Sequence, residues 1–436
     1  MSSQSVEYAI VGAGPAGSHL AARLAEAGSE VALFDPKGAW EKPCGGGVTS
    51  RGLREYPFLL DGSDKNGNRV ETMDIVSSGG RSVSVKLNYP FVVYSRRVLN
   101  GILLRRATDA GAEFIRDAVT DFSKEGATWV LRCRNGKCWR ASFLVGADGA
   151  ASSTRRRLLG IFPARDVALT IGYNLALHDG SLSSGSAIPS AVARLTKKAV
   201  VRFVKGFRGY LWAFPRTTEI NFGGGCRLGE RTGEELRGLL RNFIEETTDG
   251  ANLPAESLSF FAAKIPILDY ATWPNLKASG DGWALIGDAA GFVDPLTGEG
   301  IYYALKSADL LFGALCDSRE LPTYQADVDQ KPIAAGAERE PGGDRTLRPM
   351  WDRVDVRYEN AWRSEFGFEL QRASHLLRRF YEGRFLGMEI NEAMVRIARV
   401  HGGIRRVMVR SVLGEQSYIT LKADLLRSIP RIFSGF

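Results

Sequence analysis

The sequence predicts an α/β fold with a nucleotide-binding lobe, an interleaved antiparallel β-sheet lobe and a C-terminal helical segment. Three observations support this prediction. A strand, a glycine-rich turn, a helix and a second strand follow one another over residues 6–34. Apolar and polar residues alternate over 69–94, as in antiparallel strands. Basic residues are interleaved with Leu, Ile, Val and Phe after residue 372, as in amphipathic helices.

The elements of the first part of the chain follow from apolar runs and the turn residues between them. Small residues at 16–27 predict a helix that packs closely on its neighbouring strands. A hairpin is expected at Asn135-Gly136, a dipeptide that favours two-residue turns. The other predicted elements are strands at 6–11, 30–34, 113–116, 127–132 and 139–145, a glycine-rich turn at 44–47 and a helix at 97–110.

The second half of the chain contains predicted elements of both lobes. The Ser- and Gly-rich segment 180–190 is expected to be a mobile loop, and segment 330–349, rich in Pro, Gly and charge, to be a linker. The predicted elements are strands at 202–214, 219–226 and 283–286 and helices at 233–247 and 300–315.

The domains are expected to be discontinuous, because nucleotide-binding motifs are spread from residue 6 to about residue 315. The predicted segments are 1–68, 96–165 and 276–330 for the nucleotide-binding domain, 69–95 and 166–275 for the substrate domain, and 331–436 for a linker and basic C-terminal helices.

The composition excludes several classes of protein. The chain has 436 residues, a net charge of +8 and 44% apolar residues, which is enough for a large core. No apolar run reaches the ~18–20 residues that span a bilayer, and no secretory signal is visible at the start. Five Cys fit a reducing cytoplasm, and four His without metal-ligand spacing predict no metal site.

The positive charge is concentrated at the C-terminal end. Residues 372–436 contain twelve Lys and Arg against five Asp and Glu, so they supply seven of the eight net charges. A basic amphipathic face binds anionic membrane, nucleic acid or phosphorylated ligands, and without a nucleic-acid module we expect no nucleic-acid partner. Two interpretations stay open: the helices hold a cytoplasmic protein at the inner membrane face, or they cap the substrate cavity.

The first motif, G-A-G-P-A-G at 12–17, follows the first strand and opens the first helix. Gly12 permits a tight turn, Gly14 lets a pyrophosphate approach the backbone, and Gly17 lets the helix pack on the strand. Free N–H groups from Ala16 onward face the phosphates. Asp35, at the end of the second strand, accepts from a ribose 2′-hydroxyl and disfavours a 2′-phosphate, which predicts a dinucleotide such as FAD or NAD.

Two further motifs, G-A-D-G at 146–149 and G-D-A-A at 287–290, also follow apolar strands. Asp288 is placed to hold the ribityl or pyrophosphate part of a flavin. Gly300 begins a helix whose positive end would face the flavin ring and stabilise its reduced form. The cofactor-binding residues predicted in this part of the chain are Asp148, Gly149, Gly287, Asp288, Gly298, Gly300 and Ile301.

In this order, the three motifs resemble those of the p-hydroxybenzoate hydroxylase-like FAD-dependent oxidoreductases. The resemblance covers about residues 6–320 and implies a Rossmann-type FAD-binding domain with FAD as the cofactor. Members of this group contact FAD with an arginine at a strand-to-helix turn, which Arg96 matches, and the resemblance also places Val119 beside the cofactor.

Two segments resemble the geranylgeranyl reductase family within this group. Residues 42–47, K-P-C-G-G-G, resemble the family's Cys-Gly-rich loop beside the flavin ring. Residues 210–215, Y-L-W-A-F-P, resemble its Y-x-W-x-F-P motif in the substrate cavity. Alternation in a strand would make the three rings one aromatic wall suited to an isoprenoid, or else a core strand. The resemblance implies cofactor contacts from Lys42, Cys44, Gly45 and Gly47 and substrate contacts from Tyr210, Trp212, Phe214 and Pro215.

The resemblance implies an FAD-dependent oxidoreductase that reduces isolated carbon–carbon double bonds of a geranylgeranyl-type isoprenoid or lipid. Hydride would come from reduced FAD and a proton from the site, with Cys44 as the first candidate donor and Tyr210 as the second. The electron donor is expected to be NAD(P)H or ferredoxin, and a quinol stays open.

Two other functions stay open on the sequence. A flavin-dependent monooxygenase or halogenase would use oxygen on a small aromatic or carrier-bound substrate. Halogenases carry a related W-x-W-x-I-P stretch, but Tyr210 replaces its first Trp and no counterpart of their catalytic lysine is visible. The third function is that of a quinone-linked electron-transfer flavoprotein.

Overall fold

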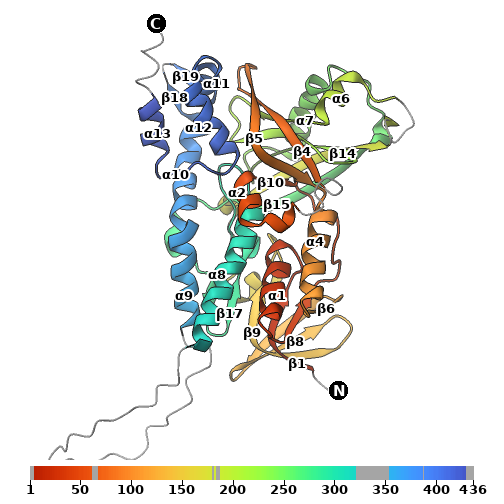
Figure 1. The fold of residues 1–436 in the computed structure, drawn as a ribbon, viewed down its shortest axis with the longest axis vertical. Coiled ribbons are helices and arrows are strands. Elements are labelled where there is room, and N and C mark those ends of the chain that lie inside the picture. The colour runs from red at the N-terminus through yellow and green to blue at the C-terminus, as the bar shows by residue number, and fades with distance from the viewer. Residues whose placement is uncertain are drawn as a thin grey trace, which may run out of the picture.

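Figure 1 shows the fold as a computed structural model, which describes residues 4–60, 67–178, 181–182, 187–320, 353–385 and 387–428. A mainly parallel sheet lies at the lower end of the long axis, and an antiparallel sheet lies at the upper end. The two sheets alternate along the chain, which confirms the interleaved α/β fold. Among the described helices, none combines the length and the hydropathy that a membrane span requires.

The lower sheet has the order β16-β17-β9-β1-β2-β6, and the hairpin β7–β8 extends from β9. Tyr8, in its central strand, pairs in parallel with Val31 on one side and with Phe143 on the other. The strands are β1 (Gln4–Val11), β2 (Val31–Phe34), β6 (Glu113–Ile115), β7 (Val119–Glu125), β8 (Thr128–Cys133), β9 (Cys138–Gly146), β16 (Ser279–Gly280) and β17 (Trp283–Leu285).

The upper sheet has the order β11-β10-β14-β13-β12-β4-β5-β3, with β15 paired to β10. Two short strands, β18 and β19, form a separate antiparallel pair that does not belong to this sheet. The strands are β3 (Gly47–Val48), β4 (Gly67–Val76), β5 (Ser82–Tyr94), β10 (Val167–His178), β11 (Ser181–Leu182), β12 (Lys198–Phe203), β13 (Gly209–Pro215), β14 (Glu219–Arg227), β15 (Leu258–Pro266), β18 (Arg384–Phe385) and β19 (Met388–Glu389).

Helices cover both sheets and connect their two ends. The helix α1 packs between α4 and α8, and the helices α11, α12 and α13 close the upper end beside the antiparallel sheet (Figure 1). The helices are α1 (Pro15–Glu26), α2 (Ser50–Glu55), α4 (Arg96–Asp109), α5 (Ser153–Leu158), α6 (Ser190–Leu195), α7 (Gly233–Thr247), α8 (Ile301–Glu320), α9 (Val354–Trp362), α10 (Phe368–Glu382), α11 (Ile390–Val400), α12 (Gly402–Val412) and α13 (Leu421–Ser428).

Two apolar clusters explain how these layers hold together. The larger one joins the parallel sheet to α1, α4, α8 and α9. A second one joins β4 and β5 to α11 and α12, with Met73, Val85, Val395 and Met408 among its buried members. The C-terminal helices are therefore packed into the molecule through one face.

Several local predictions need correction. The strand predicted over 202–214 is two strands, β12 and β13, because the chain turns at Gly206 with φ of +65°. The hairpin at Asn135-Gly136 has a longer connection than two residues, since the Cys133 N–H donates to the carbonyl of Lys137 (2.9 Å). The long strands β10 and β15 were not predicted.

Two predicted irregular segments lie partly or wholly outside the described residues. Segment 180–190 contains β11 and the start of α6, so it is not a loop throughout, and residues 180 and 183–186 lie outside the described part of the chain. The predicted linker 330–349 lies wholly outside it. The domain boundaries drawn from the sequence remain predictions.

Candidate active site

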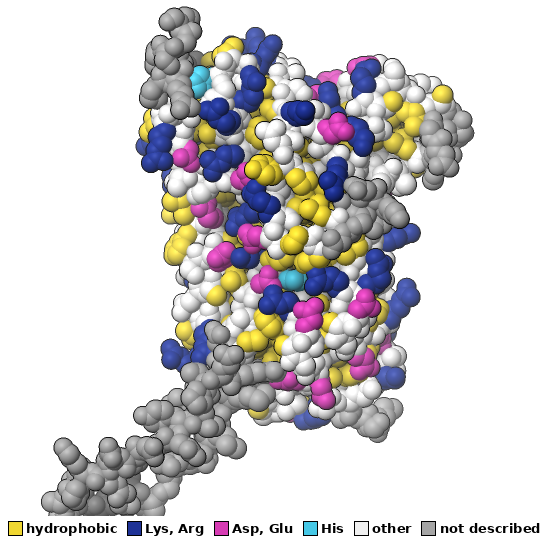
Figure 2. All heavy atoms as spheres, in the orientation of Figure 1, with side chains coloured by type: hydrophobic (Ala, Val, Ile, Leu, Met, Phe, Trp, Pro, Cys, Tyr) yellow, Lys and Arg dark blue, Asp and Glu magenta, His cyan; other side chains and the backbone are white. Residues whose placement is uncertain are grey.

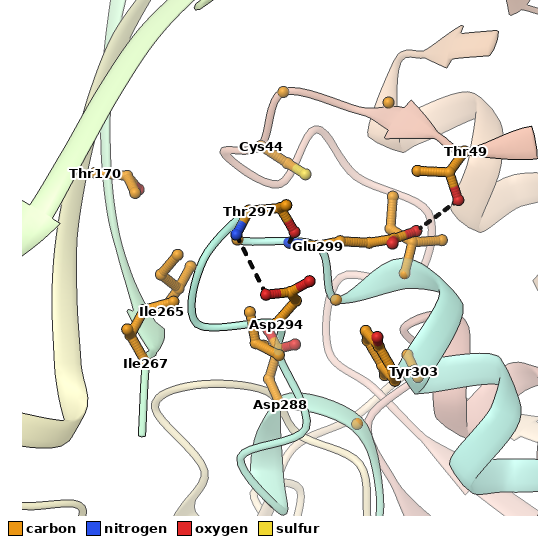
Figure 3. Close-up of a pocket in the computed structure, with 18 of the residues that line it drawn as sticks. Cys44, Thr49, Thr170, Ile265, Ile267, Asp288, Asp294, Thr297, Glu299 and Tyr303 are labelled. Atoms are coloured by element: carbon orange, nitrogen blue, oxygen red, sulfur yellow. Dashed lines mark hydrogen bonds between the residues drawn. The ribbon is translucent and has the colours of Figure 1, made fainter. Parts of the chain in front are cut away.

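A cavity of about 1050 Å³ extends from the turns at the ends of the parallel strands to the inner faces of the C-terminal helices. Its first part, the nucleotide groove, is lined by the turns that follow β1, β2, β9 and β17. Its second part, the chamber, is lined by β4, β5, β12 and β13 on one side and by α11, α12 and α13 on the other. The 44–47 loop and the segment before α8 also line the cavity, and Figure 3 shows this region.

The glycine-rich turn after β1 is held by backbone geometry. Gly12 has φ of +107°, and a Cβ on it would lie 2.4 Å from the carbonyl oxygen of Ala147. A Cβ on Gly14 would meet nothing within 4 Å, so this glycine lies beside open space. Because α1 begins at Pro15, the N–H groups of Ala16 and Gly17 have no acceptor within the helix.

The Asp35 carboxylate, at the end of β2, holds the backbone on two sides of the groove. It accepts hydrogen bonds from the N–H groups of Ala13 (3.0 Å), Lys37 (2.8 Å) and Gly38 (2.9 Å). The carboxylate thus ties the glycine-rich turn to the end of β2. Asp35 lines the cavity, and its contact with a ribose remains a prediction.

Asp148 has a structural role that the sequence did not indicate. Its carboxylate accepts from the hydroxyls of Ser152 and Ser153 and from the N–H of Thr154 (3.0 Å), so it stabilises the start of α5. Gly149 beside it has φ of +81°. Both residues line the cavity, and their contacts with a cofactor remain predictions.

Lys42 and Asp288 form an ion pair across the groove, with 3.1 Å between Nζ and Oδ2. The two residues come from the loop after β2 and the turn after β17, which are far apart in sequence. Gly287 adopts φ of +58° and donates its N–H to the Ser307 hydroxyl (3.0 Å), which fixes this turn against α8. Val119 also lines the cavity.

The segment before α8 carries two carboxylates that lie close together (Figure 3). Asp294 is buried and accepts from the Thr297 N–H (3.3 Å) and the Tyr418 hydroxyl (2.7 Å). Glu299 is half-buried and accepts from the Thr49 hydroxyl (3.0 Å). The sequence analysis assigned no role to either acid.

The electrostatics of this segment favour a protonated Glu299. Burial raises the pKa of Glu299 to about 7, and the nearby Asp294 adds to the rise, whereas the Thr49 hydrogen bond and Arg51 oppose it. Gly414, with φ of +71°, lies over the hydrogen-bonded side chains of Thr49 and Glu299, since a Cβ on it would be 3.1 Å from the Thr49 hydroxyl oxygen. The predicted cofactor residues Gly298, Gly300 and Ile301 flank Glu299 and line the cavity.

Two buried arginines surround Cys44. Burial by itself would raise the pKa of the Cys44 thiol, but the Arg96 guanidinium, the Gly46 N–H (3.3 Å from Sγ) and Arg216 outweigh it and lower that pKa below its ordinary value. Arg216 also donates to the Cys44 carbonyl (2.6 Å). This environment stabilises the thiolate relative to that of an ordinary cysteine.

The three aromatic residues of β13 form one wall, as alternation in a strand predicts. Ring centroids are 5.7 Å apart for Tyr210 and Trp212 and 6.2 Å apart for Trp212 and Phe214. All three line the cavity. A Cβ on Gly45 would lie 3.0 Å from the Phe214 ring, so glycine lets the loop approach the wall closely. The Tyr210 hydroxyl donates to the carbonyl of Thr297.

Two predicted site residues do not line the cavity. Gly17 lies against the turn behind it, since a Cβ there would be 1.9 Å from the Gly12 carbonyl oxygen. Pro215 lies at the end of β13, where its carbonyl accepts from the Asn68 side chain (3.2 Å). Gly17 thus has the packing role expected of it, and a substrate contact from Pro215 has no support from its position.

Comparisons with known proteins agree with this geometry. The chain matches the family described as an FAD binding domain over residues 5–174. Menaquinone reductase of Mycobacterium tuberculosis is 30% identical over 350 residues, which cover 74% of this chain and 80% of that protein. Geranylgeranyl diphosphate reductase of Rhodobacter capsulatus is 29% identical over 307 residues, covering 68% and 71% respectively. The chain belongs to the geranylgeranyl reductase family of FAD-dependent oxidoreductases.

The fold agrees with this membership. A solved geranylgeranyl bacteriochlorophyll reductase-like protein from Thermoplasma acidophilum has a TM-score of 0.69 with this chain. The match covers 98% of this chain and 96% of that one at 18% identity, and includes the C-terminal helices. At this identity the likeness concerns the fold alone.

The groove of this geranylgeranyl reductase family member fits FAD. Gly14 leaves open space where a pyrophosphate would approach the first turn of α1. Arg96 is buried in the cavity wall, and its Nε has no hydrogen-bond partner among the described residues, although its Nη2 donates to Asn100 (3.3 Å). A buried guanidinium with a free donor in the wall is suited to an acceptor on a bound cofactor.

The chamber wall made by the C-terminal helices is the main feature that the sequence analysis missed. The amphipathic pattern predicts an apolar face on these helices, but not which surface it covers. The structure shows that it caps the cavity, one of the two interpretations left open. The apolar lining residues from these helices are Met394, Ile404, Val407, Met408, Val412, Leu421 and Leu425.

Proposed function

We propose that this enzyme saturates isolated carbon–carbon double bonds of a geranylgeranyl-type isoprenoid chain. The observation that carries the proposal is the continuity between the aromatic wall and the chamber. Trp212 and Phe214 lie against the 44–47 loop, and apolar side chains of the sheet and of α11 and α12 enclose the space beyond them. A long hydrocarbon chain is the ligand class that such a site favours. Two relatives, a geranylgeranyl diphosphate reductase and a menaquinone reductase, support this reaction class.

A small aromatic substrate fits this site less well. Hydroxylation of a phenol requires polar groups placed around the ring, because a buried hydroxyl needs a hydrogen-bond partner. Both polar groups of the wall are already engaged, since the Trp212 Nε1–H donates to Asn221 (2.7 Å) and the Tyr210 hydroxyl donates to the Thr297 carbonyl. The lining that β4, β5 and α12 contribute is apolar except for Ser411, with Met73, Phe91 and Val407 among its residues.

The chain's own residues have distinct tasks in this reaction. FAD, when bound and reduced, supplies the hydride for one alkene carbon. The glycine-rich turn and the Lys42–Asp288 pair hold the two sides of the groove. The N-terminus of α8 carries a partial positive charge that stabilises negative charge beside Gly300. The aromatic wall excludes water, and its ring faces stabilise positive charge on the substituted carbon of the substrate.

Glu299 is the side chain best suited to supply the proton for the second alkene carbon. Its pKa of about 7 leaves it partly protonated at neutral pH. The surroundings of Cys44 lower the pKa of its thiol below the ordinary value. Burial raises the pKa of Tyr210 above its ordinary value, and its hydroxyl is engaged with the Thr297 carbonyl. Roles for Cys44 and Tyr210 in catalysis remain predictions.

The electron donor in this proposal is NAD(P)H or ferredoxin. The net charge of +8 favours association with an acidic donor protein such as ferredoxin. Family hydroxylases take NAD(P)H without a second nucleotide-binding domain, so the nicotinamide donor is compatible with this chain. Anaerobic bleaching of the flavin by each donor in turn distinguishes them.

The reaction is tested by single turnover without oxygen. The holoenzyme is reduced with dithionite, mixed with geranylgeranyl diphosphate or a geranylgeranyl lipid, and followed by flavin absorbance and mass spectrometry of the lipid. Reoxidation with the addition of two hydrogen atoms to the lipid per flavin is expected. A flavin that stays reduced until air is admitted, with product formed only in oxygen from a phenol or a halide acceptor, would replace this proposal by the monooxygenase or halogenase alternative.

A further inference from the structure

The C-terminal helices α11, α12 and α13 have two faces of different chemistry. Their inner faces line the chamber, through Met394, Val407 and Leu425 among others. Their outer faces lie at the upper end of the molecule, where Figure 2 shows Lys and Arg side chains gathered over α11 and α12. The inner face is explained by the cavity, and the outer face requires a separate explanation.

All charged side chains that are exposed between residues 390 and 428 are positive. The three acids in this range are each engaged instead. Glu392 is 6% exposed and bonds Arg81 (2.7 Å), Glu415 pairs with Arg54 (2.8 Å), and Asp424 accepts from Gln416 (2.7 Å). The exposed cations are Arg396, Arg399, Arg406, Arg410, Lys422 and Arg427.

Large aliphatic side chains are exposed among these cations. Val400 is 87% exposed directly after Arg399, Leu426 is 53% exposed directly before Arg427, and Ile419 is 57% exposed. Exposed aliphatic side chains do not stabilise a surface that faces only water. A surface that binds the phosphates of nucleic acid needs cations but not aliphatic side chains. A helical face that combines Lys and Arg with exposed aliphatic side chains matches the interface of an anionic bilayer.

We propose that this outer face docks on an anionic phospholipid bilayer. The basic face comprises the six exposed cations named above together with Val400, Ile419 and Leu426. The cations would contact lipid phosphates while the aliphatic side chains enter the boundary between headgroups and acyl chains. The proposal deepens the proposed function and rests on it in one respect: a lipid tail could then pass from the bilayer into the chamber behind the same helices.

Vesicle flotation of the full-length holoenzyme tests this proposal. Vesicles of phosphatidylglycerol and phosphatidylcholine in equal parts are compared with vesicles of phosphatidylcholine alone. The variant Arg399→Ser/Arg406→Ser/Lys422→Ser removes three cations whose side chains make no hydrogen bond or ion pair within the described parts of the chain. We expect its partition onto anionic vesicles to be roughly a hundredfold weaker, since each basic residue near such a surface contributes several-fold.

The variant Arg134→Ser/Lys137→Ser/Arg156→Ser is the matched control, because it removes the same charge from exposed positions in the lower lobe. We expect it to bind vesicles as the wild type does. A second test variant, Val400→Ser/Leu426→Ser, should weaken binding at high salt as well as at low salt, because it removes an apolar contribution that salt does not screen. FAD absorbance checks that all variants retain the cofactor.

Three outcomes would overturn the proposal. These are equal binding of the wild type to the two kinds of vesicle, equal loss of binding in the test and control triple variants, and binding of duplex DNA in preference to anionic vesicles. None of them depends on isoprenoid reduction, because flotation uses no substrate. A protein that floats with anionic vesicles but fails in the anaerobic turnover would keep the membrane face and lose the proposed substrate.

Discussion

The nucleotide groove is walled mainly by backbone, whereas the chamber is walled by side chains. In the groove, turns that follow parallel strands approach one another so closely that a single Cβ at Gly12 would overlap the chain at Ala147. In the chamber, residues such as Met73, Val407 and Met408 come from a sheet and from helices more than 300 positions away. The groove is therefore specified by local conformation, and the chamber by the total volume of packed side chains.

This difference explains why the sequence predicts the cofactor more directly than it predicts the substrate. A glycine that must adopt positive φ or allow close approach can be replaced by no other residue, so it marks its position in the sequence. An apolar side chain in a cavity wall can be exchanged for another of similar volume, so it carries little information about its ligand.

The largest effect is expected from the substitution Gly12→Ala in the groove. At φ of +107° an alanine is strained, and its Cβ would lie 2.4 Å from the Ala147 carbonyl oxygen. The two costs together amount to about 3 kcal/mol of unfolding free energy, and the displaced turn should lose FAD. Denaturant unfolding of the variant and the ratio of FAD to protein absorbance measure both effects.

The matched control is Gly14→Ala, two residues away in the same turn. Gly14 has φ of −74°, and a Cβ there meets nothing within 4 Å, so the fold should be unchanged. FAD affinity should still fall about tenfold, because the Cβ occupies the space through which a pyrophosphate approaches. An unchanged FAD affinity would show that the pyrophosphate lies elsewhere.

Much of the groove could be predicted from the sequence, for a physical reason. The carboxyl ends of parallel strands meet at one edge of a sheet, so the motifs after β1, β9 and β17 must come together once the strands are recognised. The aromatic wall could be predicted too, since side chains two residues apart in a strand share a face. Asp148 shows the limit of such reasoning, because its carboxylate is engaged with α5.

The chamber and the acids beside α8 could not be predicted in the same way. The burial of Glu299 depends on Gly414, which lies over it from a segment 115 positions later, and no local pattern encodes that contact. The pairing of α11 and α12 with β5 is likewise a tertiary contact. The strands β10 and β15, which pair with each other about 90 residues apart, were not predicted either.

The substitution Glu299→Gln, at the boundary between groove and chamber, is tested by the pH dependence of the unfolding free energy. The folded chain holds the Glu299 proton up to about pH 7, whereas an ordinary glutamate releases it near 4.5, so unfolding free energy falls as pH rises between these values. The loss reaches at most about 3 kcal/mol, less where solvent screens this half-buried site. The glutamine variant should lack this decline, and it should slow anaerobic turnover while FAD stays bound.

Glu392→Gln, at the start of α11, is the control, because the pKa of Glu392 is shifted in the opposite direction to that of Glu299. Hydrogen bonds and ion pairs with Ser77, Arg396 and Arg81 outweigh burial and lower the pKa of Glu392 to about 2. Its stabilising contribution is lost only as pH falls from about 4.5 towards 2, so the destabilisation of this variant should be constant from pH 5 to 8. A constant difference for Glu299→Gln over the same range would show that Glu299 is charged throughout.

The smallest effect is expected from a volume change in the chamber, Val407→Phe. Val407 is 6% exposed and lines the cavity, so a phenyl ring would project into space that a long chain needs. We expect kcat/KM for a geranylgeranyl substrate to fall about tenfold, which corresponds to about 1.4 kcal/mol, with FAD content unchanged. A shorter prenyl substrate should be affected less, because it leaves more of the chamber free.

Val409→Phe makes the same exchange two residues along α12, where the side chain packs against the apolar cluster of β4, β5, α11 and α12 without lining the cavity. It should cost a similar amount of stability and leave the preference for chain length unchanged. If both variants reduced kcat/KM equally for long and short substrates, the substrate would not occupy the chamber. The apolar side chains of the chamber would then contribute to folding but not to substrate choice. A loss confined to Val407→Phe and to long substrates would instead show that side-chain volume in the chamber sets chain length, while the backbone of the groove sets the cofactor.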